Sequence, residues 1–156
     1  MIDISIIDSR RKRIEQLLKS VPVDESAGLE LQSHWARYTC VVMSGALEDT
    51  LKVMLREYAE DHANPAIANF ASAQLGYFQT ASTDEICKLL AKFDKQWEKE
   101  FNDFLTEEIK TAVNSVVGNR HRVAHGLDSA VTMSQLKQWF PKIEGLLLWI
   151  AVTLLK

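Results

Sequence analysis

Apolar residues recur along this chain at alternating spacings of three and four, and no stretch longer than a few residues alternates with period two. Spacings of three and four place apolar side chains on one face of an α-helix, whereas period two is typical of a strand. The pattern therefore predicts an all-α fold. We expect a compact bundle of about five to six helices, with a long central helix and an apolar C-terminal helix.

Two helices are predicted in the first part of the chain. The first ends before Pro22, because proline disfavours the helical conformation in the residue before it. A short linker then reaches about Gly28, where a long second helix begins. This helix extends to about Asp61 and is expected to be the central element. The apolar stripe of the first helix consists of Ile4, Ile7, Ile14 and Leu18.

Polar residues with N-cap chemistry mark where the shorter helices begin. Asn64 and Pro65 predict a helix through Phe70, since asparagine accepts hydrogen bonds from free backbone N–H groups and proline fits the first turn. Ser82 or Thr83 is predicted to cap the next helix in the same way.

The segment that follows carries one further apolar stripe, which begins at Trp97. A break in this stripe at Thr106 is left open. Gly126 is expected to end the helix, because glycine readily takes the left-handed conformation found just after helix ends.

The last predicted helix begins near Thr132 or Ser134, with Pro141 as a kink or a restart. From Leu146 to Leu155 it is apolar on nearly every side. A helix of this kind is either wrapped by its own domain or shared with a second copy. The run is well short of the roughly 20 residues that a membrane span needs.

Composition narrows the classes of protein that this chain can represent. Of its 156 residues 47% are hydrophobic and 25% charged, and residues 1–156 are treated as a single domain. The net charge of -3 argues against a protein that coats nucleic acid through bulk positive charge, so any polyanion must bind at a local cluster of basic residues.

The cysteines and the N-terminus indicate the compartment. Cys40 and Cys87 show no spacing typical of a disulfide framework, and the N-terminus does not have the basic segment followed by an apolar segment that a secretory signal has. A cytoplasmic protein without a membrane segment is expected.

Arg120 is the residue that breaks the pattern of apolar stripes. It follows Ile109, Val113 and Val116 on one helical line, where an apolar residue is expected. Because a buried guanidinium keeps its charge and needs an anion, its partner is either a carboxylate of the protein or the phosphate of a ligand. Glu48, on an apolar face of the long helix, is the candidate carboxylate.

Two histidines and a second arginine accompany Arg120. His121 and His125 are four residues apart and share one helix face, close to Arg122. Histidine exchanges protons near neutral pH and arginine binds phosphate, so the cluster suits phosphodiester cleavage without a metal. The alternatives are histidines that only cap helix carbonyls, or a metal site, for which third and fourth ligands are missing.

Gly118 leaves the local geometry open, because glycine is unfavourable inside a helix. If the helix breaks there, Asn119 caps a new short helix whose free N–H groups add to Arg120 in binding a phosphate. Either geometry produces an anion site, with Asn119 and Arg122 as substrate-binding residues.

Residues 118–126, with the sequence GNRHRVAHG, resemble the signature of HEPN domains, in which an arginine, a polar residue and three further residues precede a histidine. An aromatic-rich helical start, the stretch SGALEDTLK at residues 44–52 and the final apolar helix resemble the RiboL-PSP-HEPN branch of that superfamily. The resemblance covers most of the chain.

The resemblance implies a helical bundle, often a homodimer, and in many members a metal-independent endoribonuclease that acts as a toxin of a toxin–antitoxin pair or in defence. Carried over by position, Arg120 stabilises the phosphate, His125 is the general acid or base, and His121 orients the site. RNA is then the substrate and an antitoxin protein a partner, with no cofactor or metal.

Two qualifications follow from the same resemblance. Some members of the family are non-catalytic binding or regulatory modules. The alternative to a ribonuclease is therefore that this chain is such a module, which dimerises or binds a nucleotide or RNA. In one branch a tyrosine two residues after the histidine is adenylylated. This chain has Leu127 at that position, so the resemblance does not imply that form of control.

Overall fold

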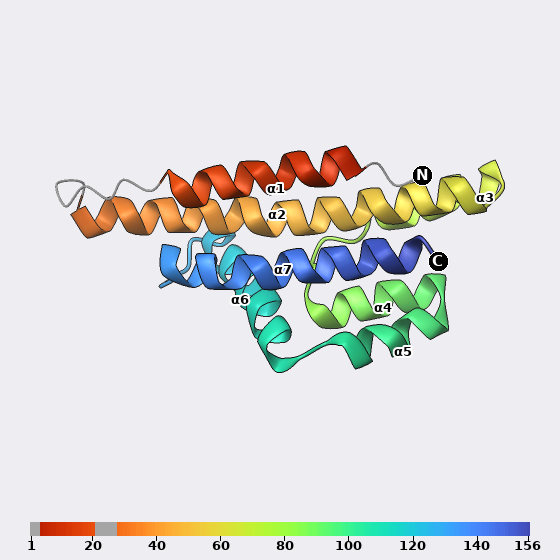
Figure 1. Cartoon of the computed structure of the whole chain (residues 1–156). Coiled ribbons are helices and arrows are strands. Elements are labelled where there is room, and N and C mark those ends of the chain that lie inside the picture. The colour runs from red at the N-terminus through yellow and green to blue at the C-terminus, as the bar shows by residue number, and fades with distance from the viewer. Residues whose placement is uncertain (1–3, 21–27) are drawn as a thin grey trace.

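The computed structural model describes residues 4–20 and 28–156, and within these residues it contains seven α-helices and no strand (Figure 1). The all-α prediction is confirmed, but the expected five to six helices are seven, because the segment that begins near Trp97 is divided at Thr106. The linker expected around Pro22 lies outside the described residues. The helices are α1 (Ile4–Lys19), α2 (Gly28–His62), α3 (Pro65–Leu75), α4 (Thr83–Phe93), α5 (Lys95–Phe104), α6 (Glu107–Ala124) and α7 (Met133–Leu154).

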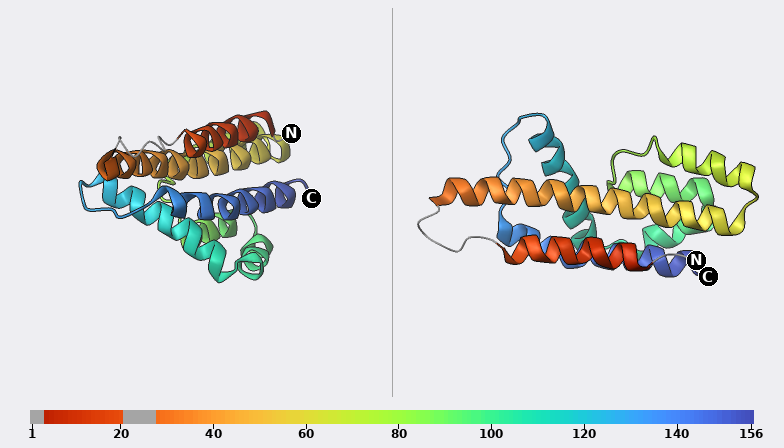
Figure 2. Two further views of the ribbon diagram at one scale, coloured as in Figure 1. Left: turned by 60° about the vertical axis from the view of Figure 1, so that its left-hand side comes forward. Right: turned by 90° about the horizontal axis from the view of Figure 1, so that it is seen from above.

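Three helices form the centre of the molecule. α2, α6 and α7 pack against one another, and α1 lies against α2 and α7 (Figures 1 and 2). α2 is 35 residues long and is the central element, as predicted. Each fully buried apolar side chain contributes about 2 kcal/mol to folding. Those on the inner face of α2 include Met43, Leu47, Leu51, Met54 and Leu55.

α4 and α5 form a helical hairpin beside this centre (Figure 1). Asp94 separates the two helices: its extended backbone ends α4, and its side chain accepts a hydrogen bond from the N–H of Gln96 at 2.7 Å. Phe101 of α5 is completely buried, and its ring centroid lies 5.6 Å from that of Trp149 in α7. This aromatic contact docks the hairpin on the core.

α6 is one continuous helix. Thr106 caps it by accepting a hydrogen bond from the N–H of Ile109 at 3.2 Å. The break considered at Gly118 does not occur, so Asn119 is not an N-cap. Gly118 lies on an exposed face of the helix, where a glycine lowers helix stability by only about 1 kcal/mol.

α7 begins after Thr132 and contains Pro141 inside one continuous helix, so no restart occurs there. Its C-terminal part is only half wrapped by the rest of the chain. Leu146 is completely buried, whereas Leu148 and Val152 are 65% and 50% exposed. Within residues 4–20 and 28–156, no helix combines the length and the apolar character that a membrane crossing requires.

Two phenylalanines offer a matched test of this core. Phe101→Ala should lower the free energy of unfolding by about 3–5 kcal/mol, because it removes a buried ring and leaves a cavity. Phe70, on α3, is 64% exposed, so Phe70→Ala should change the free energy by less than about 0.5 kcal/mol. Urea titrations followed by circular dichroism measure both. Similar losses in the two variants would contradict the position of α5 in the core.

Candidate functional site

The C-terminal end of α6 positions the predicted cluster. Gly126 has the left-handed conformation, with φ of 66°. The N–H groups of Gly126 and Leu127 bond to the carbonyls of Val123 at 3.1 Å and Arg122 at 2.8 Å. This is the Schellman motif, so the prediction that Gly126 ends the helix is confirmed. His125 is the capping residue, and its backbone is therefore fixed by the turn that follows it.

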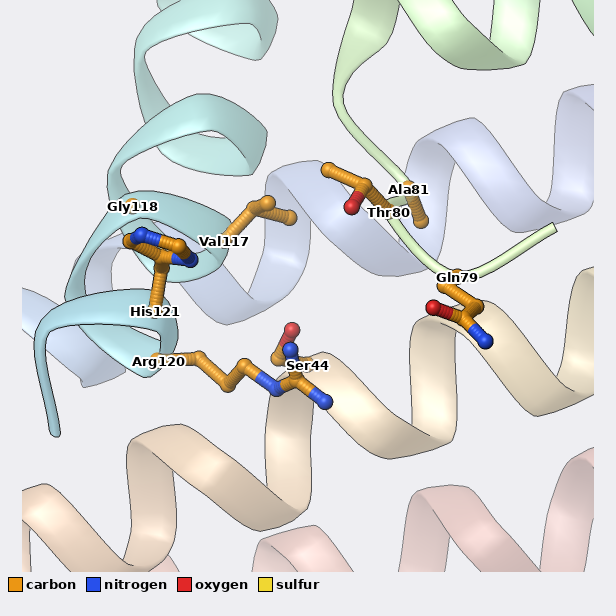
Figure 3. A pocket seen from close by; sticks show the side chains of 8 residues that line it. All are labelled: Ser44, Gln79, Thr80, Ala81, Val117, Gly118, Arg120 and His121. Carbon is orange, nitrogen blue, oxygen red and sulfur yellow. The ribbon is translucent and has the colours of Figure 1, made fainter. Parts of the chain in front are cut away.

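A pocket of about 240 Å³ lies beside this part of α6 (Figure 3). α6, α2 and the loop between α3 and α4 contribute its walls. Of the predicted site residues, Arg120 and His121 line the pocket, whereas His125 does not. The complete lining consists of Ser44, Gln79, Thr80, Ala81, Val117, Gly118, Arg120 and His121.

Arg120 extends toward Ser44 of α2 and is half-buried (Figure 3). The expected ion pair with Glu48 is absent, because Glu48 bonds to Lys52 one turn further along α2, with 2.8 Å between Oε1 and Nζ. Among the described residues, neither a carboxylate nor any other acceptor bonds to the guanidinium of Arg120. A half-buried guanidinium without an internal anion is suited to bind one from outside the protein.

The two histidines lie in contact on the same face of α6. The ring centroids of His121 and His125 are 4.3 Å apart, and the ring planes are tilted by 53°. Both residues are exposed to solvent. Since His121 lines the pocket and touches His125, one imidazole lies at the pocket and the other lies beside it.

Asn119 is engaged within the protein. Its Nδ2 donates to the carbonyl of Ser115, and its Oδ1 accepts from the hydroxyl of Ser129, both at 2.8 Å. Ser129 is only 4% exposed, so this bond ties the segment after α6 to the helix. Both polar atoms of the Asn119 amide are therefore bonded, which favours a positioning role over the predicted contact with a substrate.

Two further arginines hold the same segment. Arg122 donates to the carbonyl of Asp128, and Arg37 of α2 donates to the carbonyl of Ser129 at 3.4 Å. Arg37 was not apparent as a site residue in the sequence, since nothing in the pattern separates it from other surface arginines. Together with Arg120, these side chains gather positive charge at one end of α6 in a protein whose net charge is -3.

Cys40 lies beneath the site and is chemically inert. It is completely buried, and its Sγ donates to the carbonyl of Val116 at 3.4 Å. Burial raises the pKa of the Cys40 thiol to about 11, so the group is neutral at physiological pH and is not a nucleophile. In the part of the chain that the structure describes, no three His, Cys, Asp or Glu side chains are grouped as ligands of a metal ion.

Comparison with protein families gives a match over most of the chain. A sequence model described as RiboL-PSP-HEPN matches residues 5–151, nearly the whole chain. The chain belongs to the RiboL-PSP-HEPN family. The matched residues include the segment from Gly118 to Gly126. The predicted resemblance of the sequence to this family is therefore confirmed. Comparisons with curated proteins and with solved structures gave no match.

Double-mutant cycles test the partner of Glu48 in this HEPN domain. Glu48→Gln with Lys52→Met should show a coupling energy of about 0.5 kcal/mol, typical of an ion pair one helical turn apart. Glu48→Gln with Arg120→Met should show none. Chemical denaturation of the wild type, the three single variants and the two double variants measures both values. A coupling of several kcal/mol with Arg120 would restore the ion pair that the sequence suggested.

Proposed function

We propose that this HEPN domain is a metal-independent endoribonuclease in which Arg120 stabilises the scissile phosphate and His125 acts as general acid or base. The observation that carries the proposal is the Arg120 guanidinium. It has no acceptor among the described residues, and it lines a pocket beside two imidazoles in contact. Membership of the RiboL-PSP-HEPN family supports the same function.

The proposed reaction needs two proton-transfer groups and one cation. A 2′-hydroxyl attacks the adjacent phosphorus and passes its proton to a base, while the leaving 5′-oxygen takes a proton from an acid. The new O2′–P bond replaces the P–O5′ bond, which leaves a cyclic phosphate and a 5′-hydroxyl. Arg120 stabilises the negative charge on the non-bridging oxygens. His125 is one of the two proton-transfer groups, and His121 orients its ring.

A second candidate is a non-catalytic module that binds a nucleotide or RNA. The observation in its favour is that Arg120 and His121 line the pocket but His125 does not, so anion binding there does not require the His125 ring. Binding of RNA without cleavage separates this candidate from the enzyme.

In the cell, we propose that the chain is the toxin of a toxin–antitoxin pair or a defence ribonuclease that acts on cytoplasmic RNA. An antitoxin protein is then its partner. This proposal is supported by family membership and by an anion site built into a protein of negative net charge.

The chemistry is tested with purified protein and total RNA. Cleavage should persist in excess EDTA, because no step uses a metal ion. His125→Ala should lower the rate by about 10²–10⁴-fold through loss of proton transfer. Arg120→Ala should lower it by about 10²–10³-fold through loss of charge stabilisation. DNA of the same sequence should resist, since it lacks the attacking 2′-hydroxyl.

Glu48→Gln, outside the proposed chemistry, is the control variant for this assay and should cut at a rate close to wild type. Loss of cleavage in EDTA with recovery on adding a divalent ion would contradict the mechanism, and so would cleavage of DNA at a comparable rate. RNA binding without cleavage would favour the second candidate.

We also propose that two copies form a symmetric homodimer beside this site. Tyr38 and Val41 of α2 are 46% and 36% exposed, and Leu127, the last residue of the Schellman motif, is 53% exposed. A two-fold interface brings the same surface together twice, so Arg120 and His125 of both copies would line one cleft. The cleft then holds two sites, and each site combines Arg120 of one copy with His125 of the other.

The exposed end of α7 does not serve this interface. Leu148 and Val152 lie toward the C-terminal end of α7, away from the C-terminal end of α6 (Figures 1 and 2). The apolar last helix, for which sharing with a second copy was one of two alternatives, is therefore not part of the interface that we propose on α2.

Subunit exchange tests the shared site. Arg120→Ala and His125→Ala proteins, each inactive alone, are mixed in equal amounts and allowed to exchange. If each site combines Arg120 of one copy with His125 of the other, about one quarter of wild-type activity should return, because about half of the dimers are mixed and each holds one intact site of two. Mass spectrometry of labelled subunits establishes that exchange has taken place. If exchange occurs and no activity returns, the shared site is ruled out, and a monomer with full activity would also rule it out.

A further inference from the structure

The pocket has two chemically different walls (Figure 3). Arg120 makes the wall from α6 cationic, and His121 lies beside it. Gln79 and Thr80 of the loop between α3 and α4 form an uncharged polar wall. Ser44 of α2 lies between them. A phosphate accounts only for the cationic wall, so a ligand that fills the pocket must also offer hydrogen-bonding groups to the uncharged wall.

Ser44 is the residue that points to a bound ligand. It is only 6% exposed, and its hydroxyl forms no hydrogen bond with any described residue. A serine or threonine inside a helix commonly donates to the carbonyl four residues earlier, as Thr39 does to Trp35 at 2.8 Å. The Ser44 hydroxyl lacks this bond and lines the pocket instead. Among the described residues, Arg10 Nη1 is the only fully buried side-chain N or O atom without a partner, so the Ser44 oxygen is accessible from the pocket. It is therefore available to bond to a ligand there.

The loop between α3 and α4, which provides Gln79 and Thr80, is fixed by a buried side chain and by hydrogen bonds to α6. Ala81 is 2% exposed, and the N–H of Thr83 donates to Oδ1 of Asn114 in α6 at 3.0 Å. In return, Nδ2 of Asn114 donates to Oγ1 of Thr83, also at 3.0 Å. The side chains of Gln79 and Thr80 are exposed and form no hydrogen bond with the described residues. Their polar groups are thus held at the pocket and remain available.

We propose that the pocket binds one nucleotide of single-stranded RNA and selects its base, an inference that rests on the proposed ribonuclease function. Arg120 and Ser44 bind the phosphate, and Gln79 and Thr80 bond to the edge of the base. The glutamine amide presents donors and an acceptor side by side, which matches base edges that carry both. Those edges are available in unpaired RNA, whereas a duplex conceals them. The base beside the cut is therefore selected by the loop between α3 and α4.

Binding is measured in the His125→Ala protein, which keeps every lining residue and does not cut the probe. The probes are fluorescein-labelled RNA hexamers of A, of C, of U, and of alternating G and U, titrated at one salt concentration. We expect the tightest probe to bind at least about tenfold better than the weakest, the discrimination typical of a pair of well-placed hydrogen bonds.

Three further substitutions in the His125→Ala background assign this selectivity. Gln79→Ala should reduce the spread between probes to about twofold, because the base loses its hydrogen bonds. Ser44→Ala should weaken all four probes by a similar factor, because it removes a contact to the phosphate. Gln74→Ala, an exposed amide on α3 outside the pocket, is the matched control and should leave all four affinities unchanged. Thermal melts establish that each variant is folded.

The outcomes separate this inference from the ribonuclease proposal. Equal affinities for the four probes, no binding, or an unchanged spread in Gln79→Ala would overturn the inference even if the wild-type protein cuts RNA in EDTA. An unchanged affinity in Ser44→Ala would overturn the phosphate contact. Base-selective binding that depends on Gln79, in a protein whose wild-type form cuts no RNA, would support the pocket and contradict the ribonuclease proposal alone.

Discussion

The contact between α2 and α6 determines where the groups of the site lie. Cys40 and Val116 mark this contact, with 3.4 Å between the thiol sulfur and the carbonyl oxygen. Four residues are about one helical turn, so one turn beyond these residues Ser44 and Arg120 reach the same pocket. Both contact residues are completely buried, and the two helices cannot shift relative to each other without opening the core. The relative positions of Ser44 and Arg120 are therefore imposed by packing.

Three arginines lie around the contact between α2 and α6, and none of them is paired with a carboxylate among the described residues. The positive charge that they leave at the site is therefore not neutralised. Arg37 and Arg122 donate to backbone carbonyls, which are dipoles and leave the guanidinium charges unneutralised. Arg120 has no internal acceptor among the described residues. Positive potential thus remains at one end of α6 although acidic residues outnumber basic ones over the whole chain. The attraction between this protein and a polyanion therefore depends on where the charged side chains of the protein lie and not on its net charge.

The sequence was most informative where the physics is local. Ser82 and Thr132 cap helices close to where they were predicted, because a capping side chain acts on backbone groups within three residues. The motif from arginine to histidine was recognisable because one helix carries all of it. Glu48 was assigned to the wrong partner, since periodicity gives the face of a helix but not the distance to its neighbour, and Lys52 was close enough to bond to it. The pocket was missed because its three walls come from segments far apart in the chain, and only the packing of α2 against α6 and the anchored loop bring them together.

In the loop between α3 and α4, two exposed residues lie between two residues that pack against the core. Phe78 and Ala81 pack against the core, whereas Gln79 and Thr80 between them are exposed. Substitutions at exposed positions of this kind usually alter the free energy of unfolding by less than about 0.5 kcal/mol. Arg120 of α6 is half-buried, one turn beyond the completely buried Val116, and has less of this freedom. Descendants of one ancestral gene can therefore diverge at this pair of positions and change the lining of the pocket, while the folded domain is inherited unchanged.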